Sequence, residues 1–195
     1  MSQDTGRRAE LAEAATDHAL AHGLIGLSLR PLAAALGTSD RMLLYHFRNK
    51  DDVVATVLRV SNDRSVAEVQ RLRPAPDLRR AVLDLWTATT SGQLERCQRM
   101  YVEAAALGLL GREPYVSVVR EANRTWVAAI ADHLVAAGAD RSRVDRAVNL
   151  LDATFMGLQL DLPLAPDDPA HVRAVRDLAD AVCAIAGQGQ GQGSA

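Results

Sequence analysis

Lysine is almost absent from this 195-residue chain. Its 22 basic residues comprise a single lysine, Lys50, and otherwise only arginines. Aromatic residues are also scarce, at 4% of the composition. Both rarities meet in the segment LLYHFRNKDD (residues 43–52), where Tyr45 and Phe47 shortly precede Lys50. This segment therefore holds residues that need an explanation beyond general composition.

Long apolar runs are missing too. No stretch approaches the roughly 18 uninterrupted apolar residues that a membrane span requires. The polar, charged residues 3–10 contain no apolar core of a signal peptide, so a cytoplasmic protein is expected. The net charge of −2 excludes a protein that is basic throughout. Any role in nucleic-acid binding must therefore come from a local patch.

Cysteine is limited to Cys97 and Cys183, each within a helix-like pattern. Two distant cysteines give no metal-type cluster, and we interpret both as buried free thiols. His18, His22 and His171 fall on helical patterns without metal-ligand spacing. No metal and no cofactor is expected.

Apolar residues recur at helical spacing over nearly the whole chain, and no segment alternates in the manner of a strand. The sequence therefore predicts an all-α protein of about nine helices. The first helix is expected from Arg7 to His22, a long helix from Asp140 to Leu160, and the last between Asp168 and Gly187. The segment RPAPD (73–77) marks the strongest break.

The expected organisation has three parts. Residues 1–50 form a small N-terminal domain, residues 51–187 form a larger helical domain, and the low-complexity residues 188–195 form a disordered tail.

Two short helices stand out within residues 28–50. Ser28 is expected to cap the first and Gly37 to end it, while Ser39 is expected to cap the second. Two short helices joined by a tight turn make a helix-turn-helix arrangement, whose second helix enters the DNA major groove. Four positive residues and one negative residue give this segment a local charge of +3. Its hydroxyls and backbone N–H groups suit phosphate oxygens.

The stretch LSLRPLAAALGTSDRMLLYHFRNKDDVV (27–54) resembles the N-terminal DNA-binding domain of the TetR family of transcriptional repressors. The shared features are the hydroxyl that opens the second helix, the Ala–Leu–Gly turn, and His46, Phe47, Lys50 and Asp51 at the family's spacing. The resemblance is specific over roughly residues 7–60 and only general beyond, where it implies a helical ligand-binding and dimerising domain.

The resemblance implies DNA contacts by Ser28, Arg30, Thr38, Ser39, Arg41, Met42, Tyr45, His46 and Lys50.

Lys50 lies at the start of a helix, where the macrodipole disfavours a cation, so an external phosphate is the best explanation for it. Arg41 can bond bidentately to guanine, with Asp40 orienting it or accepting from cytosine. Met42 offers a contact for a thymine methyl group, and Tyr45 a contact for phosphate or thymine.

Arg30 is expected to reach a base or a phosphate, and His46 a phosphate, although a packed histidine is an open alternative. Leu43 and Phe47 are interpreted as core residues. The chain departs from the family at Leu44, where a tyrosine is common.

The resemblance also implies a ligand pocket in the second half, for a small and mostly apolar molecule. Candidate lining residues are Trp86, Cys97, Met100, Tyr101, Trp126, Phe155 and Met156, with His133 and Asp152 as further polar groups. Each of these apolar residues is also consistent with an ordinary core position.

The segment VNLLDATFMGLQL (148–160) is apolar around nearly its whole circumference, so it must be buried on two sides. We expect it to form a homodimer interface with the final helix, Val172 to Ile185. A two-fold dimer implies a palindromic double-stranded DNA operator with half-sites about 34–36 Å apart, or a multiple of this.

The sequence thus predicts a ligand-responsive repressor of the TetR type. The alternatives are a protein of the same fold without an inducer, which binds DNA for architecture or partner recruitment, and a helical interaction protein that has lost DNA binding. An enzyme is disfavoured, because no nucleophile–base order, phosphate-binding loop or paired carboxylates are evident.

Overall fold

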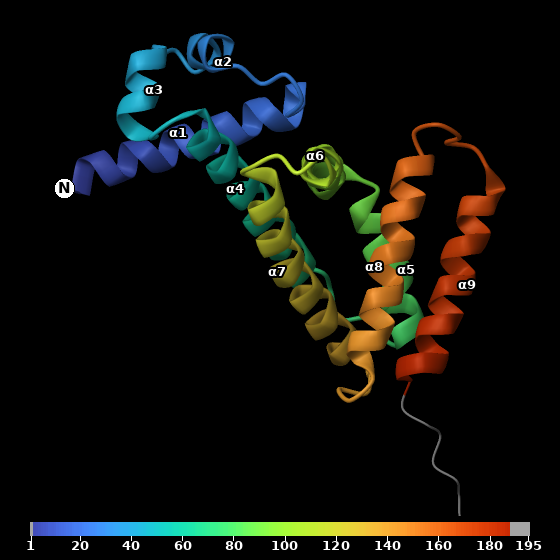
Figure 1. Ribbon diagram of the computed structural model, residues 1–195. Helices are drawn as coiled ribbons and strands as arrows, with labels where there is room; N and C mark the ends of the chain where they lie inside the picture. Colours follow the sequence, from blue (N-terminus) through green and yellow to red (C-terminus); the bar gives the residue numbers. More distant parts are fainter. Residues whose placement is uncertain (1, 188–195) are drawn as a thin grey trace, which may run out of the picture. The chain divides into compact units, whose positions relative to one another are not determined.

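The computed structural model describes residues 2–187, with side chains from residue 5 onward, and this part of the chain forms nine α-helices and no strand (Figure 1). The helices are α1 (Ser2–His22), α2 (Leu29–Ala35), α3 (Asp40–His46), α4 (Lys50–Gln70), α5 (Leu78–Thr89), α6 (Gly92–Leu109), α7 (Tyr115–Ala136), α8 (Val144–Asp161) and α9 (Pro169–Ala186). The predicted all-α class is confirmed. None of these helices is both long and apolar enough to cross a membrane.

Helix boundaries follow local capping chemistry where it is strong. Asp168 caps α9, accepting from the Ala170 N–H at 2.8 Å, and Gly187 ends the helix, as expected. The predicted start of the long helix at Asp140 is wrong: α8 begins at Val144. Asp140 instead holds a turn, because its carboxylate accepts from the Ser142 N–H at 2.8 Å and from the Ser142 hydroxyl at 2.7 Å. The first helix also begins earlier than Arg7, at Ser2.

The chain forms two compact units. The first contains residues up to Ser65 together with Gln93–Arg124, and the second contains Val66–Gly92 together with the residues from Thr125 onward. These contact-based units differ from the two domains predicted from sequence, residues 1–50 and 51–187, because they group residues by packing and not by function. The division into functional domains at residue 50 stays a prediction. The predicted tail, 188–195, lies outside the described residues.

The core of the first unit joins the N-terminal helices to α6. Leu43, Phe47 and Val57 are almost wholly buried in the same apolar cluster as Cys97 and Met100 of α6. Residues from the middle of the sequence therefore belong to the same hydrophobic core as the N-terminal helices. Cys97 is a buried free thiol as predicted, whereas Cys183 is only half-buried.

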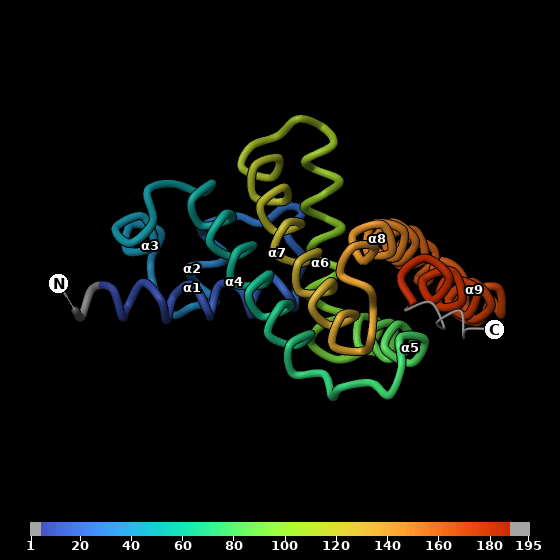
Figure 2. The backbone as a smooth tube through the Cα atoms, turned by 90° about the horizontal axis from the view of Figure 1, so that it is seen from below, coloured from blue at the N-terminus to red at the C-terminus, as the bar shows by residue number. Residues whose placement is uncertain are grey.

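The second unit is built around α9, which packs against α5 and α8; Figure 2 shows the three helices side by side. α8 and α9 run antiparallel (Figure 1). The apolar face of α9 is used within the chain, because Val175, Leu178, Ala179 and Val182 are buried there. An ion pair between Arg79 and Asp180 (2.7 Å) joins α5 to α9 at the surface.

Candidate nucleic-acid interface

The turn between α2 and α3 depends on Gly37. Its φ of +65° lies in the left-handed region, which costs a residue with a Cβ atom about 1–2 kcal/mol. The Gly37 N–H donates to Ala34 O (3.2 Å) and the Thr38 N–H donates to Ala33 O (2.9 Å), so the last carbonyls of α2 are satisfied. A tight reversal of the chain follows, which brings α3 back against α2.

The two N-cap positions differ. Ser39 caps α3 as predicted, because its Oγ accepts from the Met42 N–H at 3.2 Å. Ser28 occupies the N-cap position of α2, but its side chain makes no capping hydrogen bond. Ser28 is therefore the N-cap residue as predicted, although its exposed hydroxyl does not bond to the first turn of the helix.

One side of the α2–α3 pair is fully buried. Leu32, Ala33, Leu43 and Phe47 are each at most 1% exposed. This confirms the interpretation of Leu43 and Phe47 as core residues. Because these side chains fill the core, the rotation of α3 is fixed and its remaining side chains must face outward.

The outward side of α3 carries large apolar and aromatic side chains. Met42 is 46% exposed, Leu44 is 44% exposed and Tyr45 is 70% exposed, all on a helix of seven residues. A cluster of this kind on so short a helix marks a contact surface.

The other predicted DNA contacts lie around this helix. Ser28, Arg30, Ser39, Arg41 and Lys50 are exposed, and Thr38 and His46 are half-buried.

The cations of this surface are available to an external anion. Within residues 5–187, Arg30, Arg41 and Lys50 form no ion pair. Arg48, by contrast, pairs with Asp52 at 3.7 Å. Unpaired cations beside exposed apolar groups match a surface that touches both phosphates and base edges.

Arg8 holds α3 in place, which the sequence alone did not indicate. Its Nε donates to the carbonyl of His46 (3.0 Å) at the end of α3, and its guanidinium lies 5.0 Å from the centre of the Phe47 ring. It also pairs with Asp52 of α4 at 3.4 Å. One side chain of α1 therefore connects α3 and α4.

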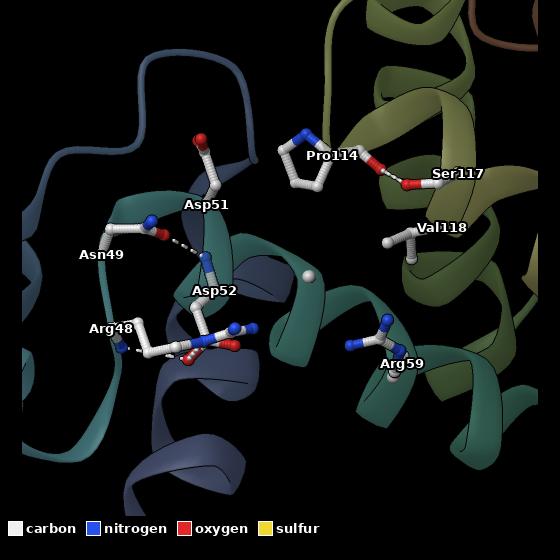
Figure 3. A pocket seen from close by; sticks show the side chains of 9 residues that line it. Arg48, Asn49, Asp51, Asp52, Arg59, Pro114, Ser117 and Val118 are labelled. Carbon is white, nitrogen blue, oxygen red and sulfur yellow. Dashed lines mark hydrogen bonds and ion pairs between the residues drawn. The ribbon is translucent and has the colours of Figure 1, made fainter.

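Asp52 organises the start of α4 (Figure 3). Its carboxylate accepts from the Arg48 N–H (3.0 Å), while its own N–H donates to Asn49 Oδ1 (2.9 Å), so Asn49 caps this helix. Burial would raise the pKa of Asp52, but the Arg48 hydrogen bond and the charges of Arg8 and Arg48 outweigh it and hold that pKa below its ordinary value. The neighbouring Asp51, which matched the family spacing, is exposed.

Glu103 of α6 holds the segment that leads into α2. Its Oε2 accepts from the N–H groups of Leu24 (2.7 Å) and Ile25 (2.8 Å). Gly23 lies against the same carboxylate, since a Cβ atom there would come within 3.3 Å of both its oxygens. No local signal could have revealed this contact, because Glu103 is 79 positions from Leu24.

A polar cavity of about 310 Å³ lies where the first turns of α4 and α7 face each other (Figure 3). Asp51 and Asp52 line it together with Arg48 and Arg59. Because both signs of charge line the cavity, it has no clear preference for an anion or a cation.

Residues 11–57 match the sequence profile of the bacterial regulatory proteins of the tetR family. This segment is a TetR-family N-terminal domain. The match spans the predicted helix-turn-helix and confirms the resemblance seen in its motifs. A search among curated proteins finds no match.

Solved structures extend the TetR-like fold to the rest of the chain. A transcriptional regulator from Rhodococcus sp. Rha1 is 24% identical with a TM-score of 0.73, and the alignment covers 92% of this chain and 97% of that one. GusR from Salmonella enterica is 19% identical with a TM-score of 0.66, covering 92% of this chain and 94% of that one. The multidrug binding protein EbrR, complexed with proflavin, is 24% identical with a TM-score of 0.66, and the alignment covers 90% of this chain and 99% of that one. At these identities the likeness shows the fold.

The TetR resemblance also implied ligand-lining residues, and the structure divides these between the two units. Cys97 and Met100 lie in the core of the first unit, and Tyr101 is half-buried on the same helix. The second unit contains Trp86 and Phe155, whose ring centroids are 4.9 Å apart, edge to face. These residues stay predicted ligand contacts.

Trp126 and Asp152 form a polar pair in the second unit. The Trp126 Nε1–H donates to Asp152 Oδ1 at 3.1 Å. Burial raises the pKa of Asp152, and the hydrogen bond from Trp126 offsets this only in part. Met156, one helical turn further along α8, is half-buried. The pair is a polar group that could orient a ligand.

Proposed function

We propose that this protein is a sequence-specific DNA-binding transcriptional regulator that reads DNA with α3. The observation that carries the proposal is the surface of α3, where Met42, Leu44 and Tyr45 are exposed beside unpaired cations. Exposed apolar groups suit thymine methyl groups in the major groove, and cations suit phosphates. The TetR-type domain at residues 11–57 supports the same function.

The proposed contacts divide into two kinds. Lys50, Ser28, Thr38 and Ser39 hold the phosphate backbone and set the position of the domain. On and beside α3, Arg41, Met42 and Tyr45 read base edges, while Arg30 and His46 add phosphate contacts. Specificity therefore depends on α3, and non-specific affinity depends on the cations around it.

Selection of bound duplexes from a random DNA pool tests this proposal. We expect one palindromic sequence to be enriched, with an affinity that falls steeply as salt rises. Lys50→Ala should reduce the slope of log affinity against log salt by about one unit, whichever DNA sequence is used. Arg73→Ala is the matched control, because Arg73 is an exposed cation of the second unit, whereas α3 belongs to the first. Failure to enrich any sequence would contradict sequence-specific binding.

We also propose a homodimer that uses α8. Leu150, Ala153, Gly157 and Leu160 are all exposed and recur at helical spacing, so they form one apolar stripe along α8. The large apolar residues Val175, Leu178 and Val182 of α9 are buried within the chain, whereas Val172 is 53% exposed, so Val172 is the main large apolar residue that α9 offers to the interface. The predicted interface over Val148–Leu160 and Val172–Ile185 is thus narrowed to the outer faces of both helices.

Sedimentation of wild type and Leu150→Arg tests the dimer. A charge within the stripe should produce monomers at micromolar concentration, because it would be buried without a partner. Leu109→Arg is the control, since Leu109 is 89% exposed and lies on α6. A wild-type monomer, or a Leu150→Arg dimer of unchanged affinity, would refute this interface.

We propose, finally, that a small, mostly apolar ligand controls DNA binding and that the protein acts as a repressor. EbrR, a protein of this fold, is described as a multidrug binding protein and was solved with proflavin. Coupling between two ligands is reciprocal and typically amounts to about 1–3 kcal/mol.

Proflavin is a practical probe, because the only tryptophans, Trp86 and Trp126, belong to the predicted lining. Saturable quenching of their fluorescence, with about tenfold weaker operator binding in its presence, is expected for a coupling in this range. In vitro transcription from a promoter that overlaps the operator should fall on adding the protein and recover with the ligand. Quenching without any change in operator binding would contradict ligand control by this probe.

A further inference from the structure

A groove of about 270 Å³ lies in the second unit, and of the predicted ligand residues only His133 lines it. Its walls come from the end of α4 and the following segment, with Val69, Leu72 and Pro74, and from the later part of α7, with Ala129 and His133. The walls are mainly apolar. This volume is close to the lower end of the range typical of small-molecule sites, roughly 300–1,000 Å³.

His133 provides an unsatisfied polar atom at this groove. Its Nε2 is buried and has no hydrogen-bond partner within residues 5–187. Buried polar atoms are nearly always paired, because leaving one unpaired costs about 1–3 kcal/mol. An unpaired imidazole nitrogen on a residue that lines a groove therefore calls for a partner from outside the chain.

Water alone is a poor occupant. A water molecule takes up about 30 Å³, so the groove has room for several, and each needs two to four polar partners. His133 is half-buried with a buried Nε2 atom, while the other polar lining residues, Gln70 and Asp132, are exposed. Most waters in the groove would face Val69 and Ala129, which offer no side-chain hydrogen bond.

We propose that this groove binds a small molecule with a single apolar ring and one hydroxyl or comparable hydrogen-bonding group, which pairs with Nε2 of His133. The carboxylate of Asp132 disfavours an anion, so the ligand is neutral or cationic. The inference goes beyond the proposed DNA binding, because the residues involved belong to the second unit and its test requires no DNA.

The test compares 4-ethylphenol with ethylbenzene, which has the same apolar body without the hydroxyl. Both are titrated into the full chain, and binding is followed by the backbone amide NMR shifts of residues 69–74 and 129–136. We expect saturable shifts there, with 4-ethylphenol binding about fivefold more tightly, as one net hydrogen bond allows.

His133→Leu should abolish this preference while ethylbenzene still binds, and His133→Gln, which keeps a hydrogen-bonding group, should restore part of it. His22→Leu, in the first unit, is the control for loss of a histidine and should behave as wild type. Ala136→Leu, which adds bulk at the groove, should weaken both compounds. The absence of saturable shifts at millimolar concentration, shifts that map elsewhere, or equal affinities for the two compounds would each overturn the proposal.

Discussion

Glu103→Ala should loosen the entrance to the DNA-reading helices. The wild-type carboxylate accepts two backbone hydrogen bonds, from Leu24 at 2.7 Å and from Ile25 at 2.8 Å. Both N–H groups belong to the short segment that connects α1 to α2. Alanine removes the oxygen that accepts both bonds and leaves the two donors to water, so α6 no longer anchors this segment.

The expected cost follows from the geometry. A hydrogen bond to a charged group contributes about 1.5–3 kcal/mol, but water can replace part of it where the donor is exposed, as at Ile25. We therefore expect a total loss of about 2 kcal/mol in the free energy of unfolding. Glu103→Gln retains an acceptor oxygen without the charge and should cost about half as much.

Urea unfolding measures the loss of stability, and amide hydrogen exchange locates it. Exchange at Leu24 and Ile25 should accelerate by more than tenfold in Glu103→Ala, with a fall in operator affinity that exceeds any effect of global unfolding. Glu95→Ala is a control on the same helix, because its only described ion pair is an exposed one with Arg99 at 3.7 Å. Unchanged exchange at Leu24 and Ile25, or equal losses for alanine and glutamine, would refute this reasoning.

Three further perturbations probe the same structure. Arg8→Ala should lower the free energy of unfolding by about 1 kcal/mol. Arg8→Lys should not restore it, because lysine lacks the planar group that both lies over Phe47 and donates to the end of α3. Equal stability of the lysine variant and wild type would contradict this. Gly37→Ala should cost about 1–2 kcal/mol, since alanine is strained at a φ of +65°, and thermal melting would show no change if the turn could relax. The pKa of Asp152 is raised in the folded state, so folding favours its protonated form. The resulting contribution to the free energy of unfolding is complete at pH values below the ordinary pKa of about 3.9, and it is lost as the pH rises through the raised pKa. Asp152→Asn should therefore gain stability relative to wild type as the pH rises, up to a plateau, and a pH-independent difference in urea midpoints would refute the assignment.

Local chemistry explains why much of the fold could be predicted. Ser39, Gly37 and Asp168 act through hydrogen bonds and backbone angles a few positions away, so their types and spacing suffice to place helix ends. The same holds for the orientation of α3, because burial of Leu43 and Phe47 fixes which residues face outward. The outward-facing side of α3 could therefore be outlined from sequence.

The supporting contacts could not be predicted, because they join residues far apart in the chain. Arg8 donates to a carbonyl 38 positions away, and Glu103 accepts from an N–H 79 positions away. An exposed glutamate on a helix and one that anchors a loop look the same in sequence. Periodicity likewise shows that Cys97 and Met100 are buried, but not that they share one core with the N-terminal helices.

The sharing of one core by α6 and the N-terminal helices limits how regulators of this kind can be recombined. A chimera that joins this head to another protein's C-terminal part at residue 65 would place a foreign α6 in the core that Cys97 and Met100 now share with the N-terminal helices. A change of even one methylene in such a core typically costs about 1 kcal/mol. A DNA-binding module that is moved to another protein must therefore carry residues 93–124 with it. Otherwise its core must be redesigned to fit the side-chain volumes at positions 97 and 100 of the new partner.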